Sequence, residues 1–243
     1  MKLFSFGSKE TQELNPKPVA PPNVGLIEYK LSTQEMDYVW RCINNVKEGR
    51  KDANMKPRLA GNIKSSYLLN DRNEWFFNNT IQPLCNKYAE WFRNVGKKFP
   101  ARQYHPYYMP DMWVNYQREG EFNPVHDHSG IYSFVIWMKI PYTHEEQNRN
   151  PIAAGSNSKK IGVFEVTYSD LLGAHQSWGF QMDPKMEGTM LFFPASLHHV
   201  VYPFYNCDKD RISVSGNVMI NTAKVVNDPY PQLGSIYHEG ATF

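Results

Sequence analysis

The fold is best predicted from residues 113–141, WVNYQREGEFNPVHDHSGIYSFVIWMKIP, which join a histidine motif to a long apolar run. The apolar run, 131–140, is typical of a strand buried in a sheet. The motif before it is His126-Asp127-His128. Because side chains alternate between the two faces of an extended segment, His126 and His128 are expected to share a face, with Asp127 on the other. Two imidazoles side by side are typical of half a metal site, and a third ligand has to come from elsewhere.

Composition limits the class of protein. The chain has 243 residues, of which 41% are hydrophobic and 14% aromatic, so one large β domain or two small ones can be built around a substantial core. A formal net charge of +2 gives no reason to expect nucleic-acid binding by bulk attraction. The three cysteines include no close pair, which argues against a disulfide framework and against a zinc finger. No apolar run has the length of a signal peptide or a membrane span, so we expect a soluble cytoplasmic protein.

Two helices are predicted before residue 104. Each begins with a capping-box pattern, Ser32-x-x-Glu35 in the first and Asp71-x-x-Glu74 in the second. Apolar side chains follow both patterns at helical spacing. Pro83 is expected to break or kink the second helix, since proline lacks the backbone N–H and its ring collides with the preceding turn.

From residue 104 onward the helical spacing disappears, and short β-rich runs alternate with turn residues. Seven such runs are predicted strands: 111–118, 131–140, 161–169, 177–182, 188–193, 199–205 and 211–221. Many short strands after a helical region favour a β-sandwich or jelly roll with helices packed on one face. The polar, turn-rich stretch 142–160 predicts a long loop, of the kind that often forms a lid or contacts a substrate.

The domain organisation follows from these patterns. Residues 1–24 are polar and proline-rich and are interpreted as a flexible N-terminal arm. A single domain is predicted over 25–222, with its β core at 104–221. Residues 223–243 have no periodicity and are interpreted as a C-terminal tail.

A second group of candidate site residues lies near the end of the β region. His198 and His199 are adjacent, and on an extended segment only one of them can face the site. Arg211 and Ser213 are two residues apart and are expected to share a strand face. A buried arginine beside a hydroxyl is a good receptor for a carboxylate, because the guanidinium binds it through two hydrogen bonds. Metal ligands together with such a receptor suggest a metal site that holds a small organic acid.

In their order along the chain, these motifs resemble the Fe(II)/2-oxoglutarate-dependent dioxygenases, in particular the prolyl-4-hydroxylase-like branch and the oxygenases encoded by bacteriophage and cyanophage genomes. That superfamily has a double-stranded β-helix, a cupin-like jelly roll, which contains a His-x-Asp/Glu pair, a distal His and a later Arg. The resemblance covers about residues 104–221. It is carried by Tyr116-x-x-x-Gly120-x-Phe122, Gly188-Thr189, Phe193-Pro194, His199-x-Val201-x-Pro203, Arg211-x-Ser213 and Asn217.

The resemblance implies a ligand set for Fe(II). His126 would be the first ligand and His199 the distal one, preferred over His198 because it falls on the His-x-Val-x-Pro pattern. His128 departs from the family, which has a carboxylate at this position in a 2-His-1-carboxylate triad. Either the site is a three-histidine triad of His126, His128 and His199, which we prefer, or Asp127 supplies an oxygen in place of His128. A neutral ligand set also leaves room for another divalent metal.

The resemblance further implies that 2-oxoglutarate is the cosubstrate. Arg211 would pair with its C5 carboxylate, assisted by Ser213 and Tyr116. Four other residues, Trp113, Asn115, Trp137 and Trp178, are candidates to line the pocket, although tryptophan in a jelly roll is more often part of the core.

The function implied is that of an oxygenase that hydroxylates a substrate with 2-oxoglutarate and dioxygen and releases succinate and carbon dioxide. The branch suggests a peptidyl residue as the substrate, and a phage-encoded enzyme would act in the host-cell cytoplasm. One alternative is a three-histidine, cupin-type metalloenzyme that does not use 2-oxoglutarate. Another is a non-catalytic jelly roll that serves as a binding module or phage structural component.

Overall fold

The computed structural model describes residues 25–46, 54–92 and 105–226, and in these ranges ten strands form two antiparallel sheets. The larger sheet has six strands in the order β1-β8-β5-β10-β3-β2, and the smaller has four in the order β4-β9-β6-β7. Their bounds are β1 Ile27–Lys30, β2 Ser65–Leu68, β3 Tyr107–Gln117, β4 Asn123–His126, β5 Tyr132–Lys139, β6 Phe164–Ser169, β7 His175–Phe180, β8 Thr189–Pro194, β9 His198–Val201 and β10 Arg211–Ile220.

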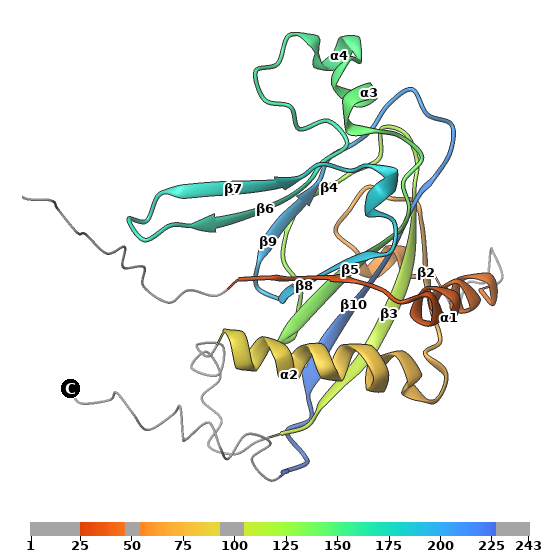
Figure 1. Ribbon diagram of the computed structural model, residues 1–243, viewed down its shortest axis with the longest axis vertical. Coiled ribbons are helices and arrows are strands. Elements are labelled where there is room, and N and C mark those ends of the chain that lie inside the picture. Colours follow the sequence, from red (N-terminus) through yellow and green to blue (C-terminus); the bar gives the residue numbers. More distant parts are fainter. Residues whose placement is uncertain (1–24, 47–53, 93–104, 227–243) are drawn as a thin grey trace, which may run out of the picture.

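From β3 onward the chain passes back and forth between the two sheets (Figure 1). β3, β5, β8 and β10 belong to the six-stranded sheet, whereas β4, β6, β7 and β9 belong to the four-stranded sheet. This is the double-stranded β-helix, or jelly roll, that the sequence predicts, and each of the seven predicted β runs overlaps a strand.

The first predicted helix is α1, Thr33–Asn44. Its capping box is formed as predicted, because the Ser32 hydroxyl accepts from the Glu35 backbone and the Glu35 carboxylate accepts from the Ser32 backbone. The two hydrogen bonds satisfy backbone donors that have no partner inside the helix.

The second helical region departs from a single kinked helix. A 3₁₀ turn, Arg72–Glu74, leads through a π-helical turn, Phe77–Ile81, into α2, Gln82–Trp91. The Asp71 carboxylate accepts from the backbone N–H groups of Phe76 and Phe77, further along the chain than a capping box places them. The wider π turn lies directly before Pro83 and accommodates a residue that lacks an N–H and needs room for its ring.

Two hydrophobic clusters lie on opposite faces of the six-stranded sheet. α1 and α2 pack on one face (Figure 1), where Val39 and Tyr88 meet Phe134 and other sheet residues. The second cluster lies between the two sheets and includes Trp137 and Val166. β5 contributes alternate side chains to both clusters, which explains why its sequence is apolar throughout.

Two parts of the β region differ from the prediction. The stretch 142–160, predicted as a loop, contains two short helices, α3 His144–Asn148 and α4 Pro151–Ala154. A capping box between Thr143 and Glu146 starts α3, a signal present in the sequence but missed. β4 was also missed, because it is short and contains Pro124, which the sheet tolerates since β4 is an edge strand.

The predicted arm, 1–24, and most of the predicted tail, 227–243, lie outside the described residues, so the domain boundaries stay predictions. The end of the second apolar stripe, beyond residue 92, also lies outside them. Across the described ranges, no helix has the length and hydrophobicity required to span a lipid bilayer.

Candidate active site

Three histidines from two separate parts of the chain meet at one end of the space between the sheets. A ligand nitrogen from each of His126, His128 and His199 lies within 4.8 Å of the other two. His126 and His199 are direct partners in the pairing of β4 with β9. The Nε2 atoms of His128 and His199 are 3.2 Å apart. In the part of the chain that the structure describes, this is the one cluster of side chains suited to hold a metal ion.

The backbone around the motif holds the histidines in place. After β4 ends at His126, the N–H of His128 donates to the Ala195 carbonyl 2.9 Å away, which ties the motif to the turn before β9. The chain then turns at Gly130, where φ is +116°. A Cβ there would lie 2.6 Å from the Val218 carbonyl oxygen, so no other residue fits without a shift of backbone. The histidine motif is therefore fixed at both ends.

Hydrogen bonds also set the orientation of two rings. Nδ1 of His126 lies 2.7 Å from the Pro124 carbonyl oxygen, and Nδ1 of His199 lies 2.9 Å from that of Leu197. A carbonyl can only accept, so each Nδ1 carries the proton and each Nε2 keeps its lone pair. Outer hydrogen bonds of this kind orient histidine ligands in metal sites.

The neighbouring candidates are placed differently. His198 is exposed, whereas His199 is 3% exposed. Because side chains alternate along a strand, His198 faces solvent and His199 faces the site. Asp127 is exposed, although it contributes to the rim of the cavity described below.

Burial keeps all three imidazoles neutral near pH 7. It is the largest cause of the lowered pKa of His126, of the pKa of about 4 for His128 and of the pKa of about 3 for His199. The nearby histidines lower the last two further, because two protonated rings would repel each other. A metal ion binds the neutral form of imidazole, so these side chains need not lose a proton to solvent before binding.

The lowered pKa values predict that the metal-free protein loses stability in mild acid. Below pH 6.5 an unfolded histidine binds a proton, whereas folded His199 does not until about pH 3, so the unfolded state gains stability as pH falls. The loss is up to about 1.4 kcal/mol per pH unit for this residue. Denaturant unfolding of the metal-free protein between pH 7 and 4 measures it. His199→Gln removes the titration of this residue and should make the profile shallower; an unchanged profile in this variant would contradict the prediction.

A cavity of about 140 Å³ adjoins the triad. Its walls come from both sheets and from the segment before β2. The main lining residues are Arg58, Leu59, Ile63, Trp113, Asn115, Gln117, Asn123, His126, Asp127, His128, Phe164, Phe193, His199, Ser213 and Ser215. Of the four predicted pocket residues, Trp113 and Asn115 line it, Trp137 is buried in the core between the sheets, and Trp178 is 63% exposed on the hairpin.

Arg211 is buried between the sheets, 3% exposed, as predicted for a carboxylate receptor. Its Nε donates to the Gln117 side-chain oxygen at 3.0 Å, and Nη2 donates to the same oxygen. Nη1 donates to the Tyr142 hydroxyl at 2.5 Å and to the Gly162 carbonyl at 2.9 Å. All three partners are neutral, and among the described residues no carboxylate forms an ion pair with Arg211.

A buried cation with only neutral partners is unfavourable, and an anion that reaches it relieves the cost. Arg211 therefore fits the carboxylate of an organic acid. Gln117, and not Arg211, lines the cavity, so the guanidinium lies behind the amide. Ser213 lines the cavity as predicted.

Tyr116 was expected beside Arg211 and is not. Trp113, Asn115 and Gln117 line the cavity, so alternation along β3 places Tyr116 on the other face. There it packs against the helix-side cluster, with its ring centroid 6.2 Å from that of Tyr67. Gln117, the direct partner of Arg211 in the pairing of β3 with β10, takes the place assigned to Tyr116.

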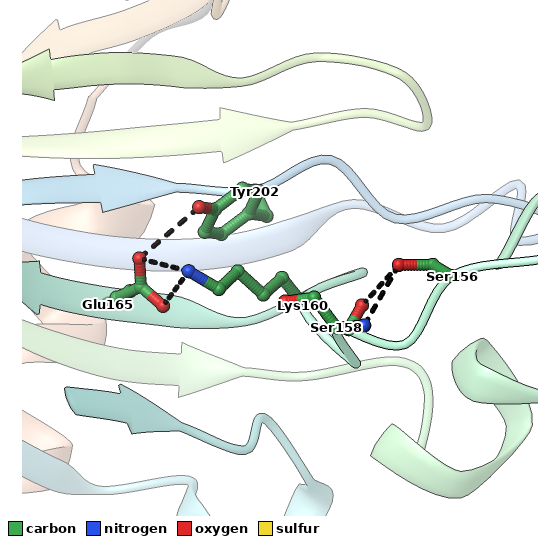
Figure 2. Close-up of polar contacts among 5 residues, drawn as sticks. All are labelled: Ser156, Ser158, Lys160, Glu165 and Tyr202. Atoms are coloured by element: carbon green, nitrogen blue, oxygen red, sulfur yellow. Dashed lines mark hydrogen bonds and ion pairs between the residues drawn. The ribbon is translucent and has the colours of Figure 1, made fainter. Parts of the chain in front are cut away.

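Lys160, two residues before Gly162, is held by a residue of β6 and a residue that follows β9 (Figure 2). Lys160 forms an ion pair with the buried carboxylate of Glu165 at 2.9 Å, and the Tyr202 hydroxyl donates to the same carboxylate at 3.2 Å. Gly162 has φ of +71°, and a Cβ there would lie 3.0 Å from the Tyr142 ring. These contacts fix the carbonyl and the hydroxyl that receive the Arg211 guanidinium.

Comparison with known proteins agrees with this geometry. Residues 111–217 match the family model described as "Putative 2OG-Fe(II) oxygenase". No curated protein matches the chain in sequence.

Several solved structures are similar to the chain. The viral collagen prolyl hydroxylase of Paramecium Bursaria Chlorella virus-1, in complex with 2OG, is 13% identical, with 79% of this chain and 94% of that chain covered and a TM-score of 0.44. A Pseudomonas putida prolyl-4-hydroxylase is 11% identical, with 81% and 93% covered and a TM-score of 0.44.

The jelly roll holds a histidine cluster and a buried arginine, an arrangement suited to an enzyme that binds a metal and an organic acid. Residues 111–217, which hold the three histidines and Arg211, match the 2OG-Fe(II) oxygenase family, whose cofactors are Fe(II) and 2-oxoglutarate. The matched family is one of enzymes, so the match supports an oxygenase.

Proposed function

We propose that this oxygenase is a hydroxylase of the prolyl-4-hydroxylase-like branch that acts on a peptidyl residue. The observation that supports it best is the joint placement of three neutral imidazoles at one point and a buried, uncompensated guanidinium between the same two sheets. One group suits a divalent metal and the other suits the far carboxylate of a dicarboxylic acid.

In this proposal His126, His128 and His199 hold the metal. Hydrogen bonds to Nδ1 orient two of the rings, and burial keeps all three neutral. When bound, Fe(II) would activate dioxygen, which oxidises 2-oxoglutarate to succinate and carbon dioxide with one oxygen atom and hydroxylates the substrate with the other. Three histidines in place of two and a carboxylate leave the metal with one more unit of positive charge, which favours binding of an anionic ligand.

Arg211 and Ser213 would hold the distal carboxylate of 2-oxoglutarate. Because Gln117 stands between the guanidinium and the cavity, its side chain has to turn aside or share the guanidinium with the acid. Tyr142 and Gly162 keep the cation in place while this happens, since both contact Nη1 and neither lines the cavity.

The second candidate is a three-histidine oxygenase that binds no 2-oxoglutarate. One observation favours it: Arg211 is already hydrogen-bonded to Gln117, Tyr142 and Gly162. The absence of a counter-charge among these partners favours the first candidate, because a neutral amide can be displaced by a carboxylate at little cost.

Anaerobic titration of 2-oxoglutarate into the Fe(II)-loaded protein tests the proposal. We expect a visible charge-transfer band that saturates with 2-oxoglutarate, and succinate release once air is admitted. In Arg211→Met the 2-oxoglutarate concentration that half-saturates the band should rise roughly 30-fold or more, because the distal carboxylate of 2-oxoglutarate loses its buried cationic partner. Saturable Fe(II) binding without a band or succinate would favour the second candidate.

A further inference from the structure

The β6–β7 hairpin is the part of the jelly roll that the chemistry above leaves unused. It projects from the body of the two sheets, with its turn at the far end (Figure 1). β7 is the edge strand of the four-stranded sheet and is exposed along almost its entire length. The hairpin also carries four large exposed apolar side chains: Tyr168, Leu171, Leu172 and Trp178.

One row of residues connects this hairpin to the triad. His126 pairs with His199, His199 pairs with Val166, and Val166 pairs with Trp178, so the four lie in register across β4, β9, β6 and β7. Directly paired residues share a face of a sheet, so Trp178 lies on the histidine side. At about 4.8 Å per strand, Trp178 is roughly 10 Å from His199.

The exposure of this row changes abruptly along its length. Val166 is buried, whereas Trp178, one strand further, is 63% exposed. The Trp178 ring stacks on Phe180, at 6.4 Å between centroids and 18° between planes, and is held on the inner side of the hairpin. A large aromatic side chain exposed on the active-site face is typical of a contact surface for a partner.

Two leucines extend the same surface at the tip. Leu171 is 77% exposed and Leu172 is 92% exposed. Their turn is closed by Asp170, whose carboxylate accepts from the N–H groups of Leu172 and Ala174 and from the Gln176 amide. The leucines are therefore presented by an ordered turn.

The size and charge of the hairpin define what fits it. From Val166 to its end at Ser169 the strand runs roughly 10 Å, and the tip lies beyond that end, so a small metabolite at the triad would not reach the tip. Residues 166–180 contain no lysine or arginine, and their one carboxylate is used in the turn, so the surface offers a nucleic-acid backbone no cation. Tyr168 and Trp178 are exposed on the inner face between the tip and Val166, so an extended polypeptide can lie across them toward His199.

We propose that the inner face of this hairpin, formed by Tyr168 and Trp178 with the tip leucines Leu171 and Leu172, docks an extended, uncharged polypeptide segment that carries the residue to be oxidised. This inference rests on the proposed function and adds the surface that selects the substrate. The peptide lies along the hairpin, and its reacting residue enters the cavity beside His199.

The test uses synthetic peptides of ten residues on an array, composed of uncharged residues with one proline each, and a second set in which two positions are Glu or Lys. The full-length, Fe(II)-loaded protein with 2-oxoglutarate is applied without oxygen, and the tightest peptides are measured by fluorescence anisotropy. The variants are Trp178→Ser and, in case that protein does not fold, the double variant Leu171→Ser with Leu172→Ser at the tip. Circular dichroism checks folding.

Matched controls come from the same chain. Trp91 is 57% exposed at the end of α2 and Ile152 is 63% exposed in α4, both outside the hairpin. We expect uncharged peptides to bind the natural protein and the hairpin variants to weaken binding roughly tenfold or more, as for an interface tryptophan. Trp91→Ser and Ile152→Ser should change it by less than about twofold.

Three outcomes overturn the proposal: affinity unchanged in the hairpin variants, equal binding of charged peptides, or no binding of either set. Sedimentation of the same samples tests whether a second copy of the chain occupies the hairpin face. A dimer that dissociates when Trp178 is replaced by serine would show that this face serves self-association. The proposed function fails separately, since it requires saturable binding of 2-oxoglutarate by the natural protein. Intact 2-oxoglutarate binding without peptide binding refutes the docking surface alone.

Discussion

Replacement of His199 by alanine is expected to weaken Fe(II) binding by at least about 100-fold, a larger loss than that typical of removing an outer hydrogen bond from a metal site. The reason is geometric: His199 is buried, faces His126 across the pair of strands, and its Nε2 lies 3.2 Å from that of His128. Removal of the ring leaves two ligands at the edge of a cavity, where water competes for the ion. Calorimetric titration with Fe(II) under nitrogen measures the affinity.

The adjacent residue provides the control. His198 is on the same strand but exposed, so His198→Ala should bind Fe(II) as the natural protein does. Equal losses in the two variants would mean that the histidines act through the stability of β9, and the assignment of His199 as a ligand would be withdrawn.

Replacement of Gln117 by glutamate is expected to weaken 2-oxoglutarate binding by roughly 30-fold or more, the range for a buried charge pair that loses its partner. The stability of the ligand-free protein will reflect two opposed effects, the new ion pair with Arg211 and the loss of the hydrogen bond that the Gln117 amide donates to the Glu121 carbonyl. The amide oxygen of Gln117 accepts from two nitrogens of Arg211, so a carboxylate at the same position pairs with the guanidinium permanently. The incoming acid then meets a neutralised cation and a like charge. Thermal unfolding gives the stability, and the charge-transfer titration gives the affinity.

Gln82→Glu is the matched control, since it adds the same charge at the start of α2, away from the cavity. It should leave 2-oxoglutarate binding unchanged. If Gln117→Glu binds 2-oxoglutarate as well as the natural protein, the acid does not reach Arg211, and the three-histidine enzyme without 2-oxoglutarate becomes the better description.

Most of the strands and the placement of several candidate site residues can be predicted from the sequence, because both depend on short-range patterns. Alternation places His126 and His128 together and separates His199 from His198, and the apolar run 131–140 is long because β5 is buried on both faces. Each of these conclusions requires only the two-residue repeat of a strand.

The residues that were missed depend on pairing between strands. Gln117 reaches Arg211 because β3 and β10 are in a particular register, and that register is set by the whole sheet and not by either strand. Tyr142 reaches the same guanidinium from the segment after β5. The error at Tyr116 has the same origin, since the motif identified the strand but not which face of it meets Arg211.

β5 has one further consequence. Its side chains contribute alternately to the helix-side cluster and to the cluster between the sheets. If either cluster unfolds, one face of β5 becomes exposed to solvent. Heat should therefore unfold both clusters in a single cooperative step. A destabilising substitution near α2, remote from the histidines, would accordingly shorten the half-life of enzyme activity on heating, even though it contacts none of the reacting groups.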